Sequence, residues 1–486
     1  MKRVAVIDIG SNSVRLVVYG ITGSALISLY DEKASCGLGN GLSATGVLDP
    51  AGKERAVREL RRFAELAKDS NLDGFYPFAT AAVRDARDGP EFVANIAAET
   101  GMAVQVISGL DEAWYAAKGV AGAIPGATGI VGDLGGGSLE LVRLENGVVE
   151  RQATLPMGAL MRPPDASAGE LKQWIAGRLA EVDWLTAYEG GDFFLVGGAW
   201  RAFARAHMRH SQHPVSVIHE YAMATADAAE LADLIGMMSE RSVTLLSSVS
   251  RRRRPIMPYA ALTLARIAEL TKPARVVASA HGLREGYVRH AIGMADGDPL
   301  LDYSRYAGVA TARIPPDGEK LLAWLAPLFG GLDNETRRWV EAACWLSDLA
   351  GREHPDRRAD IALARGSNLP SVALSHAGRA FLGTALKVRY SGPKKLGNGG
   401  GALADHLLTA DQLQMAVRLG AALRLAHAIS PSGQALDRAV MTVTADAIAL
   451  DGPPALLSGD TIGRRFSGLA VEFGRTPLLP GALAAA

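Results

Sequence analysis

Cysteine is scarce in this chain, which has only two cysteines among 486 residues. Cys36 and Cys344 lie far apart in the sequence, so we expect neither a disulfide framework nor a zinc site. This usage is typical of a reducing compartment and predicts a cytoplasmic protein. No apolar run is long enough to cross a membrane, and the run that follows Met1 ends at Asp8, too early for a signal peptide.

A charge excess of either sign is also missing. Lysine and arginine together number 51, as do aspartate and glutamate. Because no overall field attracts the chain to nucleic acid or to an anionic membrane, we expect neither as a partner. A polyanionic ligand would have to be bound by a local group of cations.

One pattern occurs twice, at Asp8–Val17 (DIGSNSVRLV) and at Asp133–Val142 (DLGGGSLELV). Each copy begins with an aspartate at the end of an apolar run, turns through small residues and continues into a second apolar run. This order predicts a β-hairpin whose tip leaves backbone N–H groups free to bind phosphate oxygens. One such tip is usually an ordinary turn, but two copies predict two facing loops.

Two facing loops suit phosphate chemistry, because phosphate charge is best neutralised from several directions. We predict that Asp8 and Asp133 hold a hydrated Mg²⁺, an ion that favours carboxylates, water and phosphate oxygens. The alternative for either aspartate alone is a carboxylate that only caps a turn. The predicted phosphate-binding residues of the loops are Ser11, Asn12, Ser13, Gly135, Gly136, Gly137 and Ser138.

The order of predicted elements divides the chain into three parts. Residues 1–125 alternate strands and helices, including an apolar strand over 102–108, and residues 126–299 begin in the same way. This duplication predicts two α/β lobes around a cleft. Helical periodicity dominates after about residue 300 and is followed by a small β element, so residues 300–486 are expected to form a mainly helical C-terminal domain.

Five short motifs of the first 295 residues or so carry a family resemblance. They are DIGSNS at 8–13, ATAAVRDA at 79–86, ISGLDEA at 107–113, GDLGGGSLEL at 132–141 and GLREG at 282–286. In combination they resemble the exopolyphosphatase and guanosine pentaphosphate phosphatase family. The resemblance implies an α/β fold with duplicated RNase H-like lobes of the actin-like ATPase type.

The resemblance also implies an activity. The expected reaction is Mg²⁺-dependent hydrolysis of the terminal phosphate of inorganic polyphosphate, or alternatively of the 5′ γ-phosphate of guanosine pentaphosphate, by a homodimer. Glu112 matches the family's proposed general base, and a position in the first turn of a helix would favour its ionised form. Alternatively, Glu112 only stabilises that helix. The resemblance also implies that the C-terminal domain is similar to HD phosphohydrolases. Because the chain contains no His-Asp dipeptide, we expect this domain to be degenerate.

Three further charged residues are candidates for the site. Glu140 and Arg15 occupy equivalent positions in the two copies of the pattern, and strand alternation would place both on the cleft side. Glu140 is predicted to orient the water or the metal ligands, and Arg15 to neutralise a phosphate, unless the two form an ion pair with each other. Arg84 is a candidate phosphate clamp, and its alternative is a local ion pair with Asp85 or Asp88.

Other features leave the function partly open. A Gly197-Gly198 turn lies where nucleotide-binding relatives place adenosine, although Gly-Gly more often only allows close packing. Arg251–Arg254 is either a solvated run or a guide for a polyanion. The same applies to the basic residues Lys387, Arg389, Lys394 and Lys395. A kinase or ATPase of the same fold, or a silent sensor of polyphosphate or nucleotide, are the competing functions.

Overall fold

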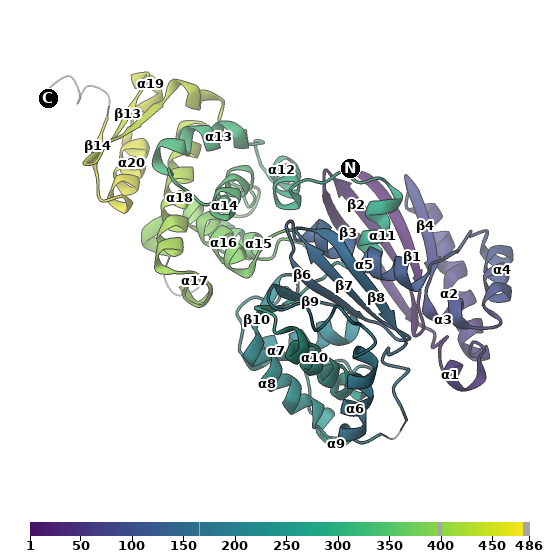
Figure 1. The fold of residues 1–486 in the computed structure, drawn as a ribbon. Coiled ribbons are helices and arrows are strands. Elements are labelled where there is room, and N and C mark those ends of the chain that lie inside the picture. Colours follow the sequence, from purple (N-terminus) through teal and green to yellow (C-terminus); the bar gives the residue numbers. More distant parts are fainter. Residues whose placement is uncertain (165, 371, 397–400, 480–486) are drawn as a thin grey trace. The chain divides into compact units, whose positions relative to one another are not determined.

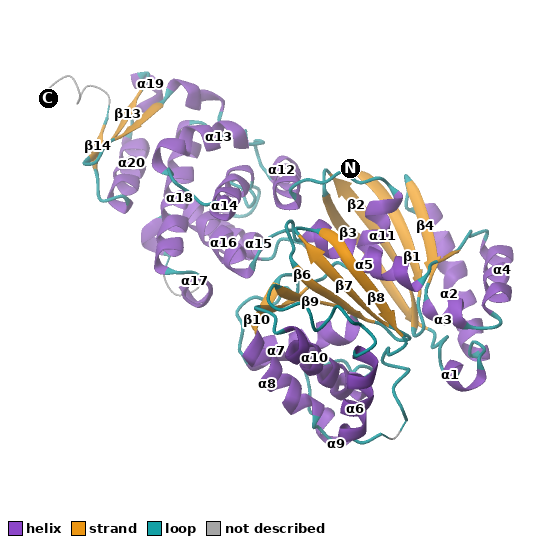
Figure 2. Cartoon of the chain, in the orientation of Figure 1, coloured by secondary structure: helices purple, strands orange, loops and turns teal. Residues whose placement is uncertain are grey.

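The computed structural model describes residues 1–164, 166–370, 372–396 and 401–479 (Figure 1). The chain forms two compact units, Met1–Gly297 and Asp298–Ala486. The first unit contains two mixed sheets with helices around them, and the second is mainly helical with one small sheet (Figure 2). Among the described residues, no helix combines the length and apolarity needed to span a bilayer.

The first sheet has the strand order β3-β2-β1-β4-β5. Strands β1 and β2 pair antiparallel with Asp8 opposite Arg15, whereas β1 and β4 run parallel. Its elements are β1 (Lys2–Ile9), β2 (Ser13–Thr22), β3 (Ala25–Ser35), α1 (Leu42–Thr45), α2 (Pro50–Asp69), β4 (Gly74–Ala79), α3 (Ala81–Asp85), α4 (Gly89–Thr100), β5 (Gln105–Val106) and α5 (Gly109–Ala123). The strand expected over 102–108 is only two residues long, because β5 is an exposed edge that pairs with two residues of β4.

The second sheet repeats the arrangement in the order β10-β11-β9-β6-β7-β8. Strands β6 and β7 pair antiparallel with Asp133 opposite Glu140, the same register as the first hairpin. Its elements are β6 (Gly129–Leu134), β7 (Leu139–Glu145), β8 (Val148–Leu155), α6 (Ala168–Leu179), β9 (Asp192–Val196), α7 (Gly198–His210), β10 (Tyr221–Ala224), α8 (Thr225–Gly236), α9 (Glu240–Val243), η1 (Arg254–Ile256), α10 (Met257–Thr271), β11 (Arg275–Ala278) and α11 (Leu283–Ala291). The two hairpins therefore end in equivalent turns.

Helices α5 and α11 each pack against the sheet of the other lobe. Alanines on one face of α5 pack against the second sheet, whereas Tyr287 and Val288 of α11 pack against the first. The two helices cross closely, because a Cβ atom on Gly286 would lie 1.8 Å from the carbonyl oxygen of Tyr115. Only glycine fits such an approach. This crossing fixes how the two sheets face each other within the first unit.

The second unit is built around one helical core that includes Trp339 and Phe381. Strands β12, β13 and β14 form its small sheet. Its elements are α12 (Pro299–Thr311), α13 (Gly318–Leu325), η2 (Ala326–Leu328), α14 (Asn334–Trp345), η3 (Pro355–Arg357), α15 (Arg358–Ser367), α16 (His376–Ser391), η4 (Pro393–Lys395), α17 (Gly401–Leu407), α18 (Ala410–Ile429), η5 (Gln434–Arg438), β12 (Val440–Val443), β13 (Ala447–Asp451), α19 (Pro454–Leu457), α20 (Asp460–Glu472) and β14 (Thr476–Leu478). The unit thus has a hydrophobic core of its own.

Candidate active site

The two hairpin tips have the same backbone geometry. The amide of Gly10 donates to the carbonyl oxygen of Ser13 at 3.1 Å, and the amide of Gly135 donates to that of Ser138 at 3.0 Å. In each tip, the turn begins two residues after the aspartate, because Asp8 pairs with Arg15 and Asp133 pairs with Glu140 in the same register.

Each tip is held by the chain segment that follows the third strand of its own sheet. That segment donates amide hydrogen bonds to the loop carbonyls, so the carbonyl groups are satisfied from one side. The bonds run from Gly39 to Ser11 (2.7 Å), from Gly37 to Asn12 (3.0 Å), from Leu160 to Gly136 (2.8 Å) and from Gly158 to Gly137 (3.2 Å). In contrast, the amides of Ser11, Asn12, Gly136 and Gly137 have no acceptor among the described residues.

The two loops meet across a cavity of about 290 Å³. A Cβ atom on Gly136 would lie 3.1 Å from the Cβ of Ser11, and one on Gly137 would lie 3.0 Å from the Cβ of Ala81. Ser11, Gly137, Ser138, Arg84 and Thr154 are among the residues that line the cavity. The structure therefore brings both loops to one place, with free N–H donors of each loop beside it. Ser13 begins β2 directly behind the first loop.

Glu112 lies next to this cavity in the first turn of α5. The helix begins at a capping box, in which Ser108 and Asp111 exchange hydrogen bonds, and this places Glu112 one residue further along. Glu112 is buried and accepts a hydrogen bond from Arg84 at 3.2 Å. Burial raises the pKa of Glu112 to about 7, against the opposing charge of Arg84 and with the support of Asp133 and Asp8. The carboxylate thus titrates near neutral pH.

Arg84 forms the local ion pair with Asp85 that was one of its two alternatives. Its Nε donates to Asp85 at 2.9 Å while its Nη1 reaches Glu112. Asp88 instead pairs with Lys53 at 2.7 Å. Arg84 therefore joins a local ion pair to the predicted base at the edge of the cavity.

Glu140 is buried deeper than Glu112 on the other lobe. It is 2% exposed and accepts a hydrogen bond from the hydroxyl of Thr154 at 3.2 Å. Burial raises the pKa of Glu140 well above its usual value, and the charges of Glu112 and Asp133 add to this. The alternative of an ion pair between Glu140 and Arg15 is wrong, because Arg15 pairs with Asp31 of the neighbouring strand, with Nε 2.7 Å from Oδ1.

Asp8 and Asp133 have different partners. Oδ2 of Asp8 accepts a hydrogen bond from Arg284 of α11 at 2.8 Å. Burial raises the pKa of Asp133 to about 6, and no described residue forms a hydrogen bond or ion pair with its carboxylate. The charges of Arg201 and Arg284 oppose this rise, but neither arginine forms an ion pair with Asp133, so its half-buried carboxylate is a favourable ligand for a cation.

The donor set of this pair fits a hard divalent cation. Among the described residues, no group of three or more histidine, cysteine or acidic side chains is arranged as a metal site. Mg²⁺, however, commonly takes one or two carboxylates and completes its octahedron with water and phosphate oxygens. Asp133 and the second oxygen of Asp8 match that requirement.

Several cations near the site were not identified from the sequence. Lys33 is exposed at the surface, whereas Arg201 and Arg253 are half-buried. Partial desolvation and the like charges of Arg253, Arg15 and Arg284 lower the pKa of Lys33 to about 8. Lys33 lies opposite Arg15 in the β2–β3 register. The alternation of side chains along β3 was therefore the sequence signal that could have placed Lys33 near the site. Arg201 and Arg253 come from distant segments.

The Gly197-Gly198 turn is filled by one of these cations. A Cβ atom on Gly198 would lie 2.7 Å from the guanidinium of Arg253, the third arginine of the 251–254 run. A Cβ atom on Gly197 would lie 2.7 Å from Oδ1 of Asp133. The turn therefore brings an arginine and an aspartate close to the backbone.

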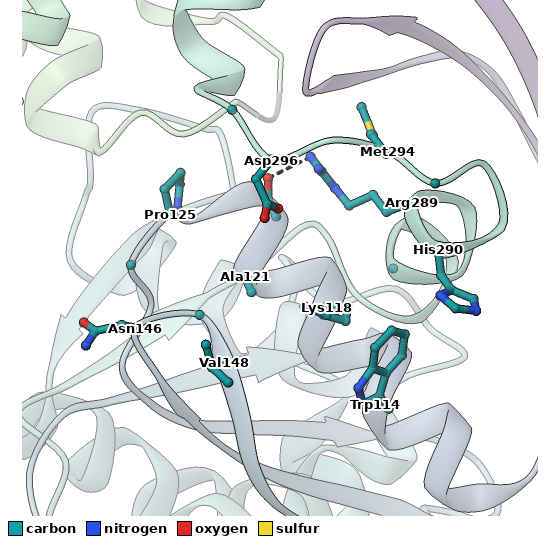
Figure 3. A pocket seen from close by; sticks show the side chains of 16 residues that line it. Trp114, Lys118, Ala121, Pro125, Asn146, Val148, Arg289, His290, Met294 and Asp296 are labelled. Carbon is teal, nitrogen blue, oxygen red and sulfur yellow. Dashed lines mark hydrogen bonds between the residues drawn. The ribbon is translucent and has the colours of Figure 1, made fainter.

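A second cavity, of about 500 Å³, lies at the other ends of α5 and α11 (Figure 3). Trp114, Lys118 and His290 lie along one side of it, and Arg289 donates to the carbonyl of Gly122 at 2.7 Å. None of the predicted site residues lines it. Of the two cavities, only the first is lined by residues of both hairpin loops.

This fold defines a class of proteins with two duplicated α/β lobes and facing hairpin loops. A model of the Ppx/GppA phosphatase family matches residues 17–293, and a model of the exopolyphosphatase C-terminal region matches residues 304–475. The chain belongs to the Ppx/GppA phosphatase family.

Similar proteins extend over most of the first unit and beyond it. Exopolyphosphatase 1 of Mycobacterium tuberculosis is 29% identical over 329 residues, which cover 62% of this chain and 92% of that protein. The solved structure of the Aquifex aeolicus family member has a TM-score of 0.53 at 24% identity, covering 60% of this chain and 97% of that one. An exopolyphosphatase structure from Cytophaga hutchinsonii has a TM-score of 0.55 at 20% identity, covering 60% and 99%. These structures share the fold of the first unit.

Proposed function

We propose that this protein is an exopolyphosphatase, which hydrolyses the terminal phosphate of inorganic polyphosphate with the help of Mg²⁺. The observation that carries the proposal is the meeting of two loops, each with unpartnered amides, beside Glu112. The names of similar proteins, such as exopolyphosphatase 1 of Mycobacterium tuberculosis, support it.

In this proposal, the terminal phosphoryl group lies between the loops, where amides from Ser11 and Gly136 donate to its oxygens. Glu112 accepts a proton from the attacking water, and its pKa near 7 suits a base at neutral pH. Glu140 accepts hydrogen bonds and orients the attacking water. The shortened chain leaves with the bridging oxygen.

Asp8 and Asp133 are the residues that would hold Mg²⁺. The ion would neutralise phosphate charge that the protein's own amides and arginines do not balance. Arg84, which lines the cavity, and Arg15, which pairs with Asp31, are proposed to assist as cations, since each has a carboxylate partner that fixes its position.

A comparison of Glu112→Gln with Glu91→Gln tests the proposal. Glu91 is the matched control, because it lies in the first turn of α4 but away from the cavity. Phosphate release from polyphosphate with Mg²⁺ should fall by about 10²-fold or more in the first variant and stay unchanged in the second. Equal activity of both variants would refute the role of Glu112.

Guanosine pentaphosphate is the second substrate to assay, since its 5′ γ-phosphate would enter the same loops. A kinase or ATPase would consume nucleotide and release no phosphate from polyphosphate alone. The proposal includes the homodimer and the cytoplasmic location that the sequence predicts, and light scattering of the purified chain measures the first of these.

A further inference from the structure

The helical unit contains a large cavity of about 870 Å³ that no step of the proposed hydrolysis uses. Five arginines and two lysines line it, against three aspartates. They come from η3, α15, α16, η4, α18 and α20 and from the segments after α12 and α14. A cavity of this size is in the range that binds small molecules, and its lining is strongly cationic.

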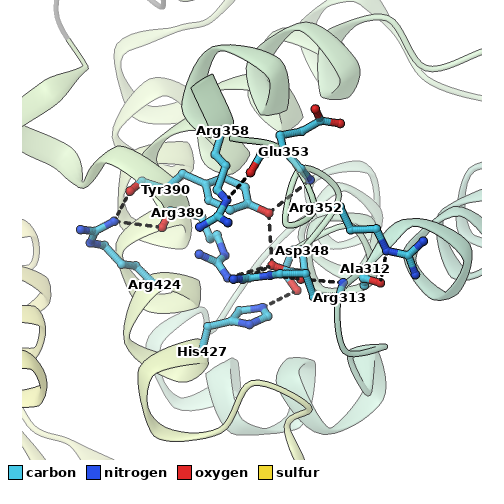
Figure 4. Close-up of polar contacts among 12 residues, drawn as sticks. Ala312, Arg313, Asp348, Arg352, Glu353, Arg358, Arg389, Tyr390, Arg424 and His427 are labelled. Atoms are coloured by element: carbon cyan, nitrogen blue, oxygen red, sulfur yellow. Dashed lines mark hydrogen bonds and ion pairs between the residues drawn. The ribbon is translucent and has the colours of Figure 1, made fainter. Parts of the chain in front are cut away.

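Asp348 is the most deeply buried of the three aspartates, and its charge is already balanced. Arg313 lies 2.8 Å and Arg389 3.2 Å from its carboxylate, and the Tyr390 hydroxyl donates at 3.2 Å (Figure 4). Burial opposes the ionised form, but these partners lower the pKa of Asp348. Asp348 therefore orders the two arginines and has no charge left for the other cations.

Lys387 is a cation without a counter-charge. Its side chain is 5% exposed and lines the cavity, yet it forms no hydrogen bond or ion pair with any described residue. An ammonium group that faces a cavity without an acidic partner is a favourable site for an anion.

Two arginines that line the same cavity, Arg424 and Arg465, form no ion pair with an acidic side chain of the described residues. Arg424 donates to the carbonyl oxygens of Arg389 and Tyr390, and Arg465 donates to that of Arg424 at 3.2 Å. Burial lowers the pKa of both guanidinium groups, and a like charge adds to this, from Arg465 on Arg424 and from Arg464 on Arg465. Neutral His427, whose Nε2 lies 2.8 Å from the Ser347 hydroxyl, adds no charge.

We propose that this cavity binds a small anion with two or more linked phosphate groups, at a site separate from the hydrolytic cleft. Three uncompensated cations exceed what one phosphate neutralises, and guanidinium groups match phosphate oxygens in pairs. The lining is dominated by cations, which suits binding of the anion. A short polyphosphate and a nucleotide polyphosphate share this chemistry.

Hydrogen–deuterium exchange of the full-length protein tests the proposal. The probe is methylenediphosphonate, whose P–C–P link resists hydrolysis, and the matched probe for nucleotides is the β,γ-methylene analogue of guanosine triphosphate. Either probe should protect peptides that span 384–392 and 421–428. Peptides at 8–14 and 133–141 report on the hydrolytic cleft in the same experiment, so the two proposals succeed or fail separately.

Lys387→Gln is the decisive variant, and Lys394→Gln is its control, because Lys394 is exposed and lies outside the cavity. Lys387→Gln should weaken protection by about 10-fold or more without lowering the melting temperature of the free protein. Arg465→Gln replaces it if that variant does not fold. Absence of protection with both probes at millimolar concentration, or equal weakening by the two lysine variants, would overturn the proposal.

Discussion

Three carboxylates of the first unit, Glu112, Glu140 and Asp133, all have raised pKa values, and loss of hydration is the largest cause for each. The charge of Asp133 adds to the rise at Glu112 and at Glu140, and the charge of Asp8 adds to the rise at Asp133. Such a group binds either protons or a cation. The site is therefore suited both to proton transfer and to a divalent ion, and each property has a measurable pH dependence.

The pH profile of hydrolysis should depend on Arg84. Glu112 acts as a base only when ionised, so kcat/KM should rise with pH through an apparent pKa near 7. Arg84→Met removes the charge that favours the ionised form and should move this limb to higher pH. Arg87→Met, at an exposed arginine of the same segment, should leave it in place. An unshifted limb in Arg84→Met would show that another group controls the rate.

The stability of the metal-free protein should depend on Asp133. Its pKa is raised in the folded state, so the stabilising contribution is present below the unfolded pKa and is lost as pH rises through about 6. Without divalent cations, Asp133→Asn should therefore be more stable than the wild type at pH 8, by about 2–3 kcal/mol. Thermal unfolding at pH 5 and pH 8 measures the difference.

Mg²⁺ supplies the second half of that experiment. It should raise the melting temperature of the wild type at pH 8 but not that of Asp133→Asn, because the ion binds the ionised carboxylate. Asp183→Asn, at an exposed aspartate of the same unit, should respond like the wild type. The same gain in all three proteins would place the ion elsewhere.

At the scale of elements, the hairpins could be predicted from the sequence because their pattern is local. Asp8 and Asp133 each follow an apolar strand and precede a small-residue turn, and the paired registers confirm the expected hairpins. The segments that hold the tips, around Gly39 and Gly158, could not be predicted. Their role depends on backbone hydrogen bonds between residues about 20 or more positions apart.

The packing of α5 and α11 against the sheet of the other lobe was also not visible in the sequence. Each helix has an apolar face, but periodicity does not reveal which sheet that face covers. As a result, Arg284 of α11 contacts Asp8 although the two residues are 276 positions apart in the sequence. Likewise, the pairing of Arg15 with Asp31 depends on which of two neighbouring strands offers the nearer carboxylate.

The close crossing of α5 and α11 leads to a prediction about stability. Gly286→Ala should destabilise the protein by about 1–3 kcal/mol or more, because the new methyl group would meet the Tyr115 carbonyl at 1.8 Å. Gly177→Ala in α6 is the matched control. No atom lies within 4 Å of its added methyl, and helix propensity predicts a gain of about 0.5–1 kcal/mol. Denaturant unfolding of both variants should give changes of opposite sign.

For the whole molecule, a net charge of zero conceals two concentrations of cations. One group surrounds the cleft of the first unit, where Lys33 and Arg253 lie close together. The other lines the cavity of the second unit around Lys387. Composition alone excluded a global field and predicted local binding of a polyanion, but only tertiary structure brings residues such as Lys33 and Arg253 to one surface.

The salt dependence of catalysis should reveal how many of the first group contact polyphosphate. For linear polyanions, each neutralised charge makes binding weaken about 3-fold for a fourfold rise in salt. The KM for long polyphosphate should therefore rise steeply between low and moderate salt, and Lys33→Gln should reduce that rise by about 3-fold. Lys2→Gln, at an exposed lysine of β1, should not change it. Parallel salt profiles for the wild type and Lys33→Gln would show that the substrate does not reach Lys33, and would restrict binding to the two loops.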